Sequence, residues 1–137
     1  MIKSIVIDTN AYSAYKRGEA DALAVVKDAQ TIVFSPVVFA ELTSGFGLGN
    51  RGKQNQQELE AFLERSKVLF LTINAQTAEE YTKIFLALKA KGTPIPTNDM
   101  WIAAMAQQLE MAVFTYDAHF SQIDGLKIIR TVDDWED

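Results

Sequence analysis

Short apolar runs that alternate with longer amphipathic segments are the feature that most limits how this chain can fold. Five runs are rich in β-branched, leucine or aromatic residues and predict strands at 2–7, 31–34, 68–71, 112–115 and 127–130. Segments of helical periodicity separate the first four runs. Strands joined by helices favour right-handed crossovers and a mostly parallel sheet. The sequence therefore predicts an α/β fold in one domain over residues 1–137, with no linker or internal repeat.

Helix signals fill the intervals between these runs. Capping residues predict four helix starts, at Thr9 or Asn10, Ser35, Thr77 and Thr97. Further helices are expected over 19–29 and 54–66, where apolar residues recur at helical spacing. The glycine-rich stretch 47–53 predicts a flexible loop, because its glycines lack the spacing of a phosphate-binding loop.

Composition narrows the class of protein. The chain has 137 residues and is 48% hydrophobic, which suffices for one core. It has no cysteine, so disulfides, thiolate zinc sites and a cysteine nucleophile are excluded. No apolar run approaches the roughly 20 residues that span a bilayer, and the N-terminal segment lacks the apolar region of a signal peptide. We therefore expect a cytoplasmic protein without a membrane partner.

The net charge of −5 argues against a dedicated nucleic-acid binder, because such proteins are usually basic. Four of the 18 acidic residues, however, are candidates for a shared site. Setting these four aside leaves 14 acidic residues against 13 basic ones. Part of the acidity therefore belongs to the candidate site itself, which weakens the objection.

These four candidates are Asp8, Glu41, Asp99 and Asp117. Asp8 and Asp117 come at the carboxyl ends of two predicted strands, where parallel sheets bind ligands. Asp99 opens a predicted helix, and Glu41 lies on an otherwise apolar or small helix face. Each has a simpler structural explanation, as a cap, a solvated side chain, a helix-dipole partner or a turn residue. Only their combination points to a site.

Clustered carboxylates repel one another, so they must bind protons or a cation. Oxygen ligands suit Mg²⁺ or Mn²⁺, which support the hydrolysis of phosphate esters. Asn10 and Thr115 are candidates for hydrogen-bonding the ligands, or for satisfying local backbone groups. The single histidine, His119, is expected to be a surface turn residue, which disfavours a Ser-His-Asp site.

Four segments together resemble the PIN domain, and in particular the VapC-type toxins of bacterial and archaeal toxin–antitoxin pairs. The segments are IVIDTNAY, FSPVVFAEL, PIPTNDMWIAAMA and AVFTYDAHF, in this order along the chain. The family's acidic quartet falls on the four candidate acids. Its polar residue two positions after the first acid falls on Asn10, and its Ser or Thr two before the last acid on Thr115.

This resemblance implies a three-layer α/β/α sandwich and a Mg²⁺- or Mn²⁺-dependent endoribonuclease. It implies four metal-binding and catalytic residues, Asp8, Glu41, Asp99 and Asp117. It further implies an RNA substrate such as tRNA or rRNA, a cognate antitoxin that covers the active-site groove, and a homodimer of the toxin.

Basic residues near the candidate acids could position RNA phosphates. Lys16 and Arg17 end the helix after Asp8, and Arg51 and Lys53 follow the helix of Glu41. The simpler interpretation of each is an ordinary solvated surface charge.

Two other classes of α/β protein need residues that this chain lacks. A haloacid-dehalogenase-like phosphatase would need Asp-x-Asp where this chain has Asp8-Thr9-Asn10. A phospho-receiver domain would need an acid pair and a lysine that are not evident. A PIN nuclease of RNA maturation without an antitoxin, or a PIN module that binds without catalysis, remains open.

Overall fold

The computed structural model describes residues 3–135, and a five-stranded parallel sheet in the order β3-β2-β1-β4-β5 forms its centre. Strand β1 lies centrally, and its Val6 pairs with Val33 on one side and Val113 on the other. All five predicted strands are confirmed, although β5 is short; Ile2 lies outside the described residues. The strands are β1 Ser4–Ile7, β2 Thr31–Phe34, β3 Val68–Phe70, β4 Ala112–Phe114 and β5 Ile128–Ile129.

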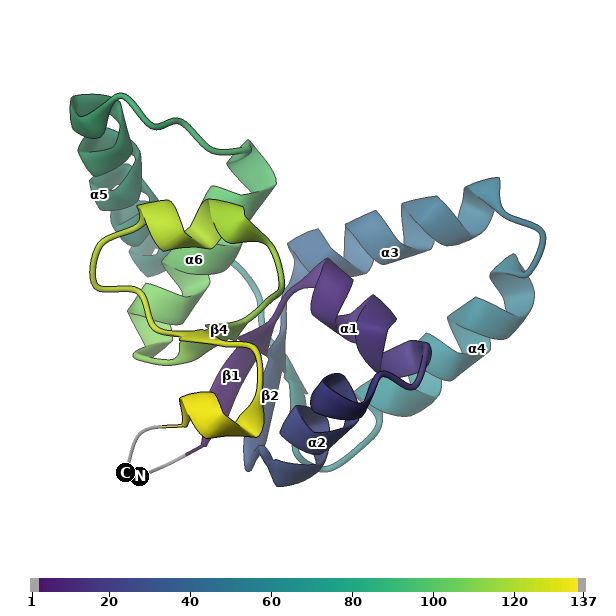
Figure 1. The fold of residues 1–137 in the computed structure, drawn as a ribbon. Coiled ribbons are helices and arrows are strands. Elements are labelled where there is room, and N and C mark those ends of the chain that lie inside the picture. Colours follow the sequence, from purple (N-terminus) through teal and green to yellow (C-terminus); the bar gives the residue numbers. More distant parts are fainter. Residues whose placement is uncertain (1–2, 136–137) are drawn as a thin grey trace.

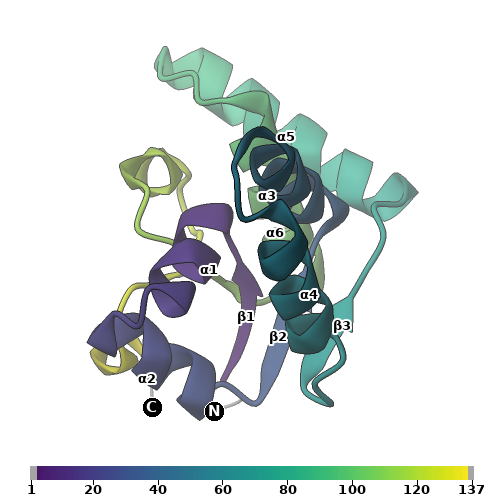
Figure 2. The same ribbon diagram turned by 90° about the vertical axis from the view of Figure 1, so that its right-hand side faces the viewer.

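Helices cover the two faces of this sheet, so the α/β/α sandwich is confirmed. Figure 1 shows α1 to α4 on one side of the strands and α5 with α6 on the other, and Figure 2 shows β1, β2 and β3 side by side. The helices are α1 Thr9–Lys16, α2 Ala20–Asp28, α3 Pro36–Leu48, α4 Gly52–Leu63, α5 Ala75–Lys91 and α6 Thr97–Leu109. Two 3₁₀ helices follow, η1 Ala118–Gln122 and η2 Val132–Asp134.

Several helix starts differ from the expectation. Asp8 rather than Thr9 or Asn10 caps α1, because its side chain accepts the Thr9 N–H. Asn74 caps α5 and exchanges hydrogen bonds with Thr77, which is therefore the third helical residue rather than the cap. Pro96 occupies the cap position of α6, and Thr97 is already helical. Sequence spacing located these helices but did not identify the residue that occupies each cap position.

The expected loop 47–53 is mostly helical. Helix α3 continues to Leu48 and α4 begins at Gly52, so only residues 49–51 connect them. The predicted start of α3 is confirmed, because Ser35 Oγ accepts the Val38 N–H at 3.1 Å and Pro36 occupies the first turn. These two helices form the arm that projects to the right in Figure 1.

Aromatic packing fixes α1 and α4 to the sheet. The Tyr12 ring lies 5.9 Å from Phe34 on β2 and 5.2 Å from Phe62 on α4, in edge-to-face geometry. Phe34 is fully buried, and such aromatic pairs contribute beyond their buried area. The α1 helix that follows Asp8 is thereby held rigidly against the core. None of the helices in the described part of the chain is long and apolar enough to span a membrane.

Candidate functional site

Asp8 lies at the centre of a hydrogen-bond network that joins two neighbouring strands. The residue follows β1 and is 4% exposed. Its Oδ2 accepts from Thr115 Oγ1 at 2.7 Å and from Asn10 Nδ2 at 3.2 Å, and its Oδ1 accepts from Thr9 N at 2.8 Å. Asn10 Oδ1 in turn accepts the Tyr116 N–H at 2.9 Å. The carboxylate is therefore held in one orientation by donors from both strand ends.

Glu41 reaches the same edge of the sheet from α3. Its Oε1 accepts from Thr9 Oγ1 at 2.5 Å, and its Oε2 accepts from Asn98 Nδ2 at 3.1 Å. The two donors belong to α1 and α6, so Glu41 ties three helices together at this point. Glu41 is half-buried, and each of its two carboxylate oxygens is held by a hydrogen bond.

Asp99 and Asp117 meet at the imidazole of His119. The Nδ1 of His119 lies 2.9 Å from Asp99 Oδ2 and 3.1 Å from Asp117 Oδ1. Asp117 caps η1, where its Oδ1 accepts the His119 N–H at 2.9 Å. Thr115 Oγ1 accepts the Asp117 N–H at 3.0 Å, which links this pair to the network around Asp8. Three chain segments thus bring the acids together.

Burial and mutual repulsion shift the acidity of this site. Burial is the main cause that raises the pKa of Asp8 to about 6, while Thr115 and Thr9 oppose it and the charges of Asp99 and Glu41 add to it. Burial also raises the pKa of Asp99, against the hydrogen bond from His119. The same hydrogen bond raises the pKa of His119. Burial therefore disfavours the charged form of these carboxylates, and the negative charge of their neighbours adds to the effect, so a bound cation would favour their ionised form.

The donor set fits a divalent cation. One ligand atom each from Asp99, Asp117 and His119 lies within 4.8 Å of the others. The carboxylate oxygens suit hard cations such as Mg²⁺ and Mn²⁺. Among the described residues, Asp8 and Glu41 are outside this group of three. Thr115 links Asp8 to Asp117 by hydrogen bonds, and Glu41 accepts from Asn98, the residue before Asp99. The four acids predicted from the sequence are therefore neighbours in space.

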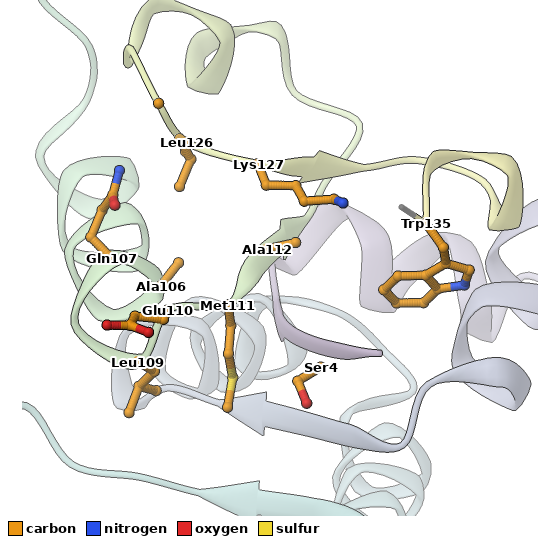
Figure 3. A pocket seen from close by; sticks show the side chains of 11 residues that line it. Ser4, Ala106, Gln107, Leu109, Glu110, Met111, Ala112, Leu126, Lys127 and Trp135 are labelled. Carbon is orange, nitrogen blue, oxygen red and sulfur yellow. The ribbon is translucent and has the colours of Figure 1, made fainter. Parts of the chain in front are cut away.

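Two pockets lie near opposite edges of the sheet. A shallow pocket of about 500 Å³ lies beside Glu41 and Asn98 and is otherwise lined by α3 residues. A second pocket of about 560 Å³ lies at the opposite, amino-terminal edge of the strands (Figure 3). Ser4, Ala112 and Lys127 line it where their strands begin, together with Met111 and Trp135. The four acids gather at the carboxyl edge of the strands, near the first pocket, and not at the amino-terminal edge.

The four predicted phosphate-binding residues lie away from the acids, at the outer ends of helices. Lys16 ends α1 and pairs with Glu58 at 3.5 Å. Arg17 pairs with Glu19 at 2.7 Å. Arg51 and Lys53 are exposed around the start of α4. Their role in substrate binding stays a prediction.

Three residues that hold the acids were not anticipated: Thr9, Asn98 and His119. Thr9 and Asn98 directly neighbour two of the predicted acids, but adjacency along the chain did not show that both would turn toward Glu41. His119 is half exposed, as expected of a surface residue, yet its ring contacts two carboxylates. Its position two residues after Asp117 was the only signal available.

A five-stranded parallel sheet covered by helices defines an α/β domain, and in this class ligands bind outside the carboxyl ends of the strands, where the acids gather. The PIN domain pattern matches residues 5–126, and this chain belongs to the PIN domain family. The resemblance inferred from the four sequence segments is thereby confirmed.

Several relatives of this chain are VapC proteins. The chain is 36% identical over 98 residues to "Ribonuclease VapC1" of Haemophilus influenzae strain R2866, covering 70% of this chain and 71% of the relative. It is similar to the solved VapBC2 of Rickettsia felis bound to a promoter DNA fragment, with 26% identity, a TM-score of 0.79, and 92% and 97% of the two chains covered. The DNA-bound VapBC of Salmonella typhimurium gives 26% identity, a TM-score of 0.80, and 94% and 98% covered.

Proposed function

We propose that this protein is a metal-dependent endoribonuclease, the toxin of a toxin–antitoxin pair, that hydrolyses phosphodiester bonds in structured RNA such as tRNA or rRNA. The observation that carries the proposal is the convergence of Asp8, Glu41, Asp99 and Asp117 at one edge of the sheet. The similarity to VapC ribonucleases supports it.

Asp8, Glu41, Asp99 and Asp117 would hold Mg²⁺ or Mn²⁺. When bound, such a cation offsets negative charge on a phosphodiester and makes an attacking water a better nucleophile. Asn10 and Thr115 fix the orientation of Asp8, and Thr9 and Asn98 fix that of Glu41. Preorganised carboxylates of this kind need no rearrangement when the cation and substrate arrive.

RNA cleavage by the purified chain tests the proposal. Wild-type protein is incubated with a labelled pool of structured RNA and Mn²⁺, beside the Asp99→Asn variant. The Asp124→Asn variant is the matched control, because it removes one carboxylate charge at an exposed position paired with Lys91. We expect cleavage by wild type and by the control, and none by Asp99→Asn or with a chelator. Cleavage that survives Asp99→Asn would refute the site.

Substrate binding by the predicted basic residues is a separate part of the proposal. The double variant Arg51→Ala plus Lys53→Ala should weaken RNA binding and flatten its dependence on salt, because each phosphate contact releases counterions. Lys27→Ala plus Lys83→Ala, on α2 and α5, is a control of equal charge. An unchanged salt slope would remove the start of α4 from the contact surface. Lys16 and Arg17 are tested in the same way.

A cognate antitoxin is the proposed protein partner. Solved relatives are VapBC complexes from Rickettsia felis and Salmonella typhimurium, which supports the proposal. A small open reading frame for a DNA-binding protein next to this gene should encode it. Its product should co-purify with this chain and abolish RNA cleavage. A gene without such a neighbour would favour the alternative of a PIN nuclease in RNA maturation.

A homodimer is proposed through the outer face of α5. Phe85 and Leu86 are 44% and 58% exposed in the middle of this helix. Glu79 lies one to two turns before them on the same face and Lys89 one turn after. Two antiparallel copies of α5 would pair the apolar residues and set each glutamate near Lys89 of the partner subunit. Leu86→Glu should give a monomer by light scattering, and Leu23→Glu on α2 is the control.

The alternative of a binding module without catalysis predicts RNA binding that Asp99→Asn leaves intact, with no cleavage by wild type. Retention of all four acids in a connected network favours the enzyme. We place its action in the cytoplasm, where the proposed RNA substrates are found.

A further inference from the structure

His119 is the only nitrogen ligand among the side chains that the structure gathers into a potential metal group in residues 3–135. Its position is fixed by the backbone around it. Asp117 Oδ1 accepts the His119 N–H at 2.9 Å, and Asp117 itself is fixed through the Thr115 hydroxyl at 3.0 Å. The imidazole is thus held at the site even though half of its surface is exposed.

The spacing of its Nδ1 matches that of a metal ligand. Adjacent ligands of an octahedral ion with bonds of about 2.1 Å are separated by about 3.0 Å, the bond length times the square root of two. The Nδ1 of His119 lies 2.9 Å from Asp99 Oδ2 and 3.1 Å from Asp117 Oδ1. These two distances therefore suit either one shared proton or one shared cation.

The other two acids differ in how they are held. Asp8 accepts three hydrogen bonds, from Thr9, Thr115 and Asn10. Glu41 accepts one hydrogen bond at each oxygen. Among the described residues, by contrast, the side chain found to hydrogen-bond Asp99 is His119 alone. The Asp99–Asp117–His119 group is therefore the part of the site with the most unused ligand capacity, and it contains a nitrogen.

We propose that His119 Nδ1 is a direct ligand of the bound cation and that it makes the site prefer a first-row transition-metal ion, with Mn²⁺ as the probe, over Mg²⁺. Mg²⁺ takes oxygen ligands and dehydrates reluctantly, whereas transition-metal ions also accept imidazole nitrogen. This inference rests on the proposed function only in requiring that the site bind a divalent cation.

The test is the ratio of Mn²⁺ to Mg²⁺ affinity, measured by calorimetry on each protein. His119→Asn places an amide where Nδ1 lies and can offer an oxygen in its place. His119→Phe keeps the ring volume and offers no ligand. Gln122→Ala, on the same 3₁₀ helix, is the control. A ratio taken within one protein is insensitive to a modest loss of stability.

We expect the wild-type ratio to favour Mn²⁺ and to fall about tenfold or more in both His119 variants, since even partners of metal ligands change affinity by about 10- to 100-fold. Gln122→Ala should keep the wild-type ratio. Pulsed electron paramagnetic resonance of the Mn²⁺-loaded wild type should show coupling to a nitrogen nucleus, which the His119→Asn variant should lose. A purely structural histidine would produce neither effect.

An unchanged ratio in both variants, or a wild-type spectrum without nitrogen coupling, would overturn the ligand role. If wild type also cleaves RNA with either ion, the nuclease proposal stands and only His119 is reassigned. If wild type binds neither ion, the metal site fails together with this inference.

Discussion

Replacing Asp8 with asparagine should stabilise the metal-free protein at high pH and not at low pH. The pKa of Asp8 is raised from 3.8 to about 6 in the folded protein. The folded state then binds more protons than the unfolded chain between these values, so stability falls as the pH rises through this window. A shift of this size corresponds to about 3 kcal/mol, at 1.36 kcal/mol for each pKa unit.

Asparagine removes this charge but loses part of the network. The carboxylate accepts from Thr9 at one oxygen and from Thr115 and Asn10 at the other, and an amide has only one oxygen. The lost hydrogen bond costs about 1 kcal/mol. Asp8→Asn should therefore be close to wild type in stability near pH 4.5 and about 2 kcal/mol more stable near pH 8.

Urea unfolding in a chelator at pH 4.5, 6 and 8 measures this difference. Asp124→Asn is the control, because it removes one carboxylate at an exposed position outside the site. Addition of Mn²⁺ should then stabilise wild type more than Asp8→Asn, because a ligand that binds only the folded state adds to its stability. A difference between Asp8→Asn and wild type that is constant with pH would refute the burial argument.

Three further predictions each rest on one local feature of the structure. The buried Thr115 hydroxyl donates to Asp8 and accepts from the Asp117 N–H. Thr115→Val should therefore lower the free energy of unfolding by about 1–3 kcal/mol in urea unfolding, and NMR titration should show the pKa of Asp8 raised further. Glu110→Gly should raise the melting temperature and add about 0.5–1 kcal/mol, because Glu110 ends α6 at φ 55°, where glycine is unstrained. In the metal-free protein, the pKa of His119 measured by NMR should lie above 6.5 and should fall in the Asp99→Asn variant. The stability that charged His119 contributes is present below pH 6.5 and is lost as the pH rises through its folded-state pKa. An Asp99→Asn variant with an unchanged His119 pKa would contradict the last of these.

The sequence located most of the fold because its local patterns were strong. The run at 31–34 matches β2 residue for residue, and Ser35-Pro36 starts α3 as expected. The stretch 47–53 misled the prediction, because its glycines weaken a helix without forbidding one. Contacts between α3 and α4 compensate for that weakness in the folded protein.

The candidate acids were also visible in the sequence. Asp8 and Asp117 follow strand runs, and parallel strands necessarily bring their carboxyl ends to one edge of the sheet. Asp99 opens a helix and Glu41 lies on an otherwise apolar helix face, and the resemblance to the PIN domain points to the same four acids. The gathering of these four acids at one edge of the sheet was therefore predictable from the sequence.

Only the tertiary structure decided how those acids are held and charged. Thr9 and Asn98 meet at Glu41 although 89 positions separate them along the chain, and His119 meets Asp99 across 20 positions. The raised pKa of Asp8 comes from burial, which depends on the packing of α1 against the sheet. Local sequence fixes where a carboxylate sits on its own element, whereas its solvent exposure and its hydrogen-bond donors are supplied by elements distant along the chain. That is why the sequence alone determined the sheet and its acidic edge, and the fold alone determined the chemistry of that edge.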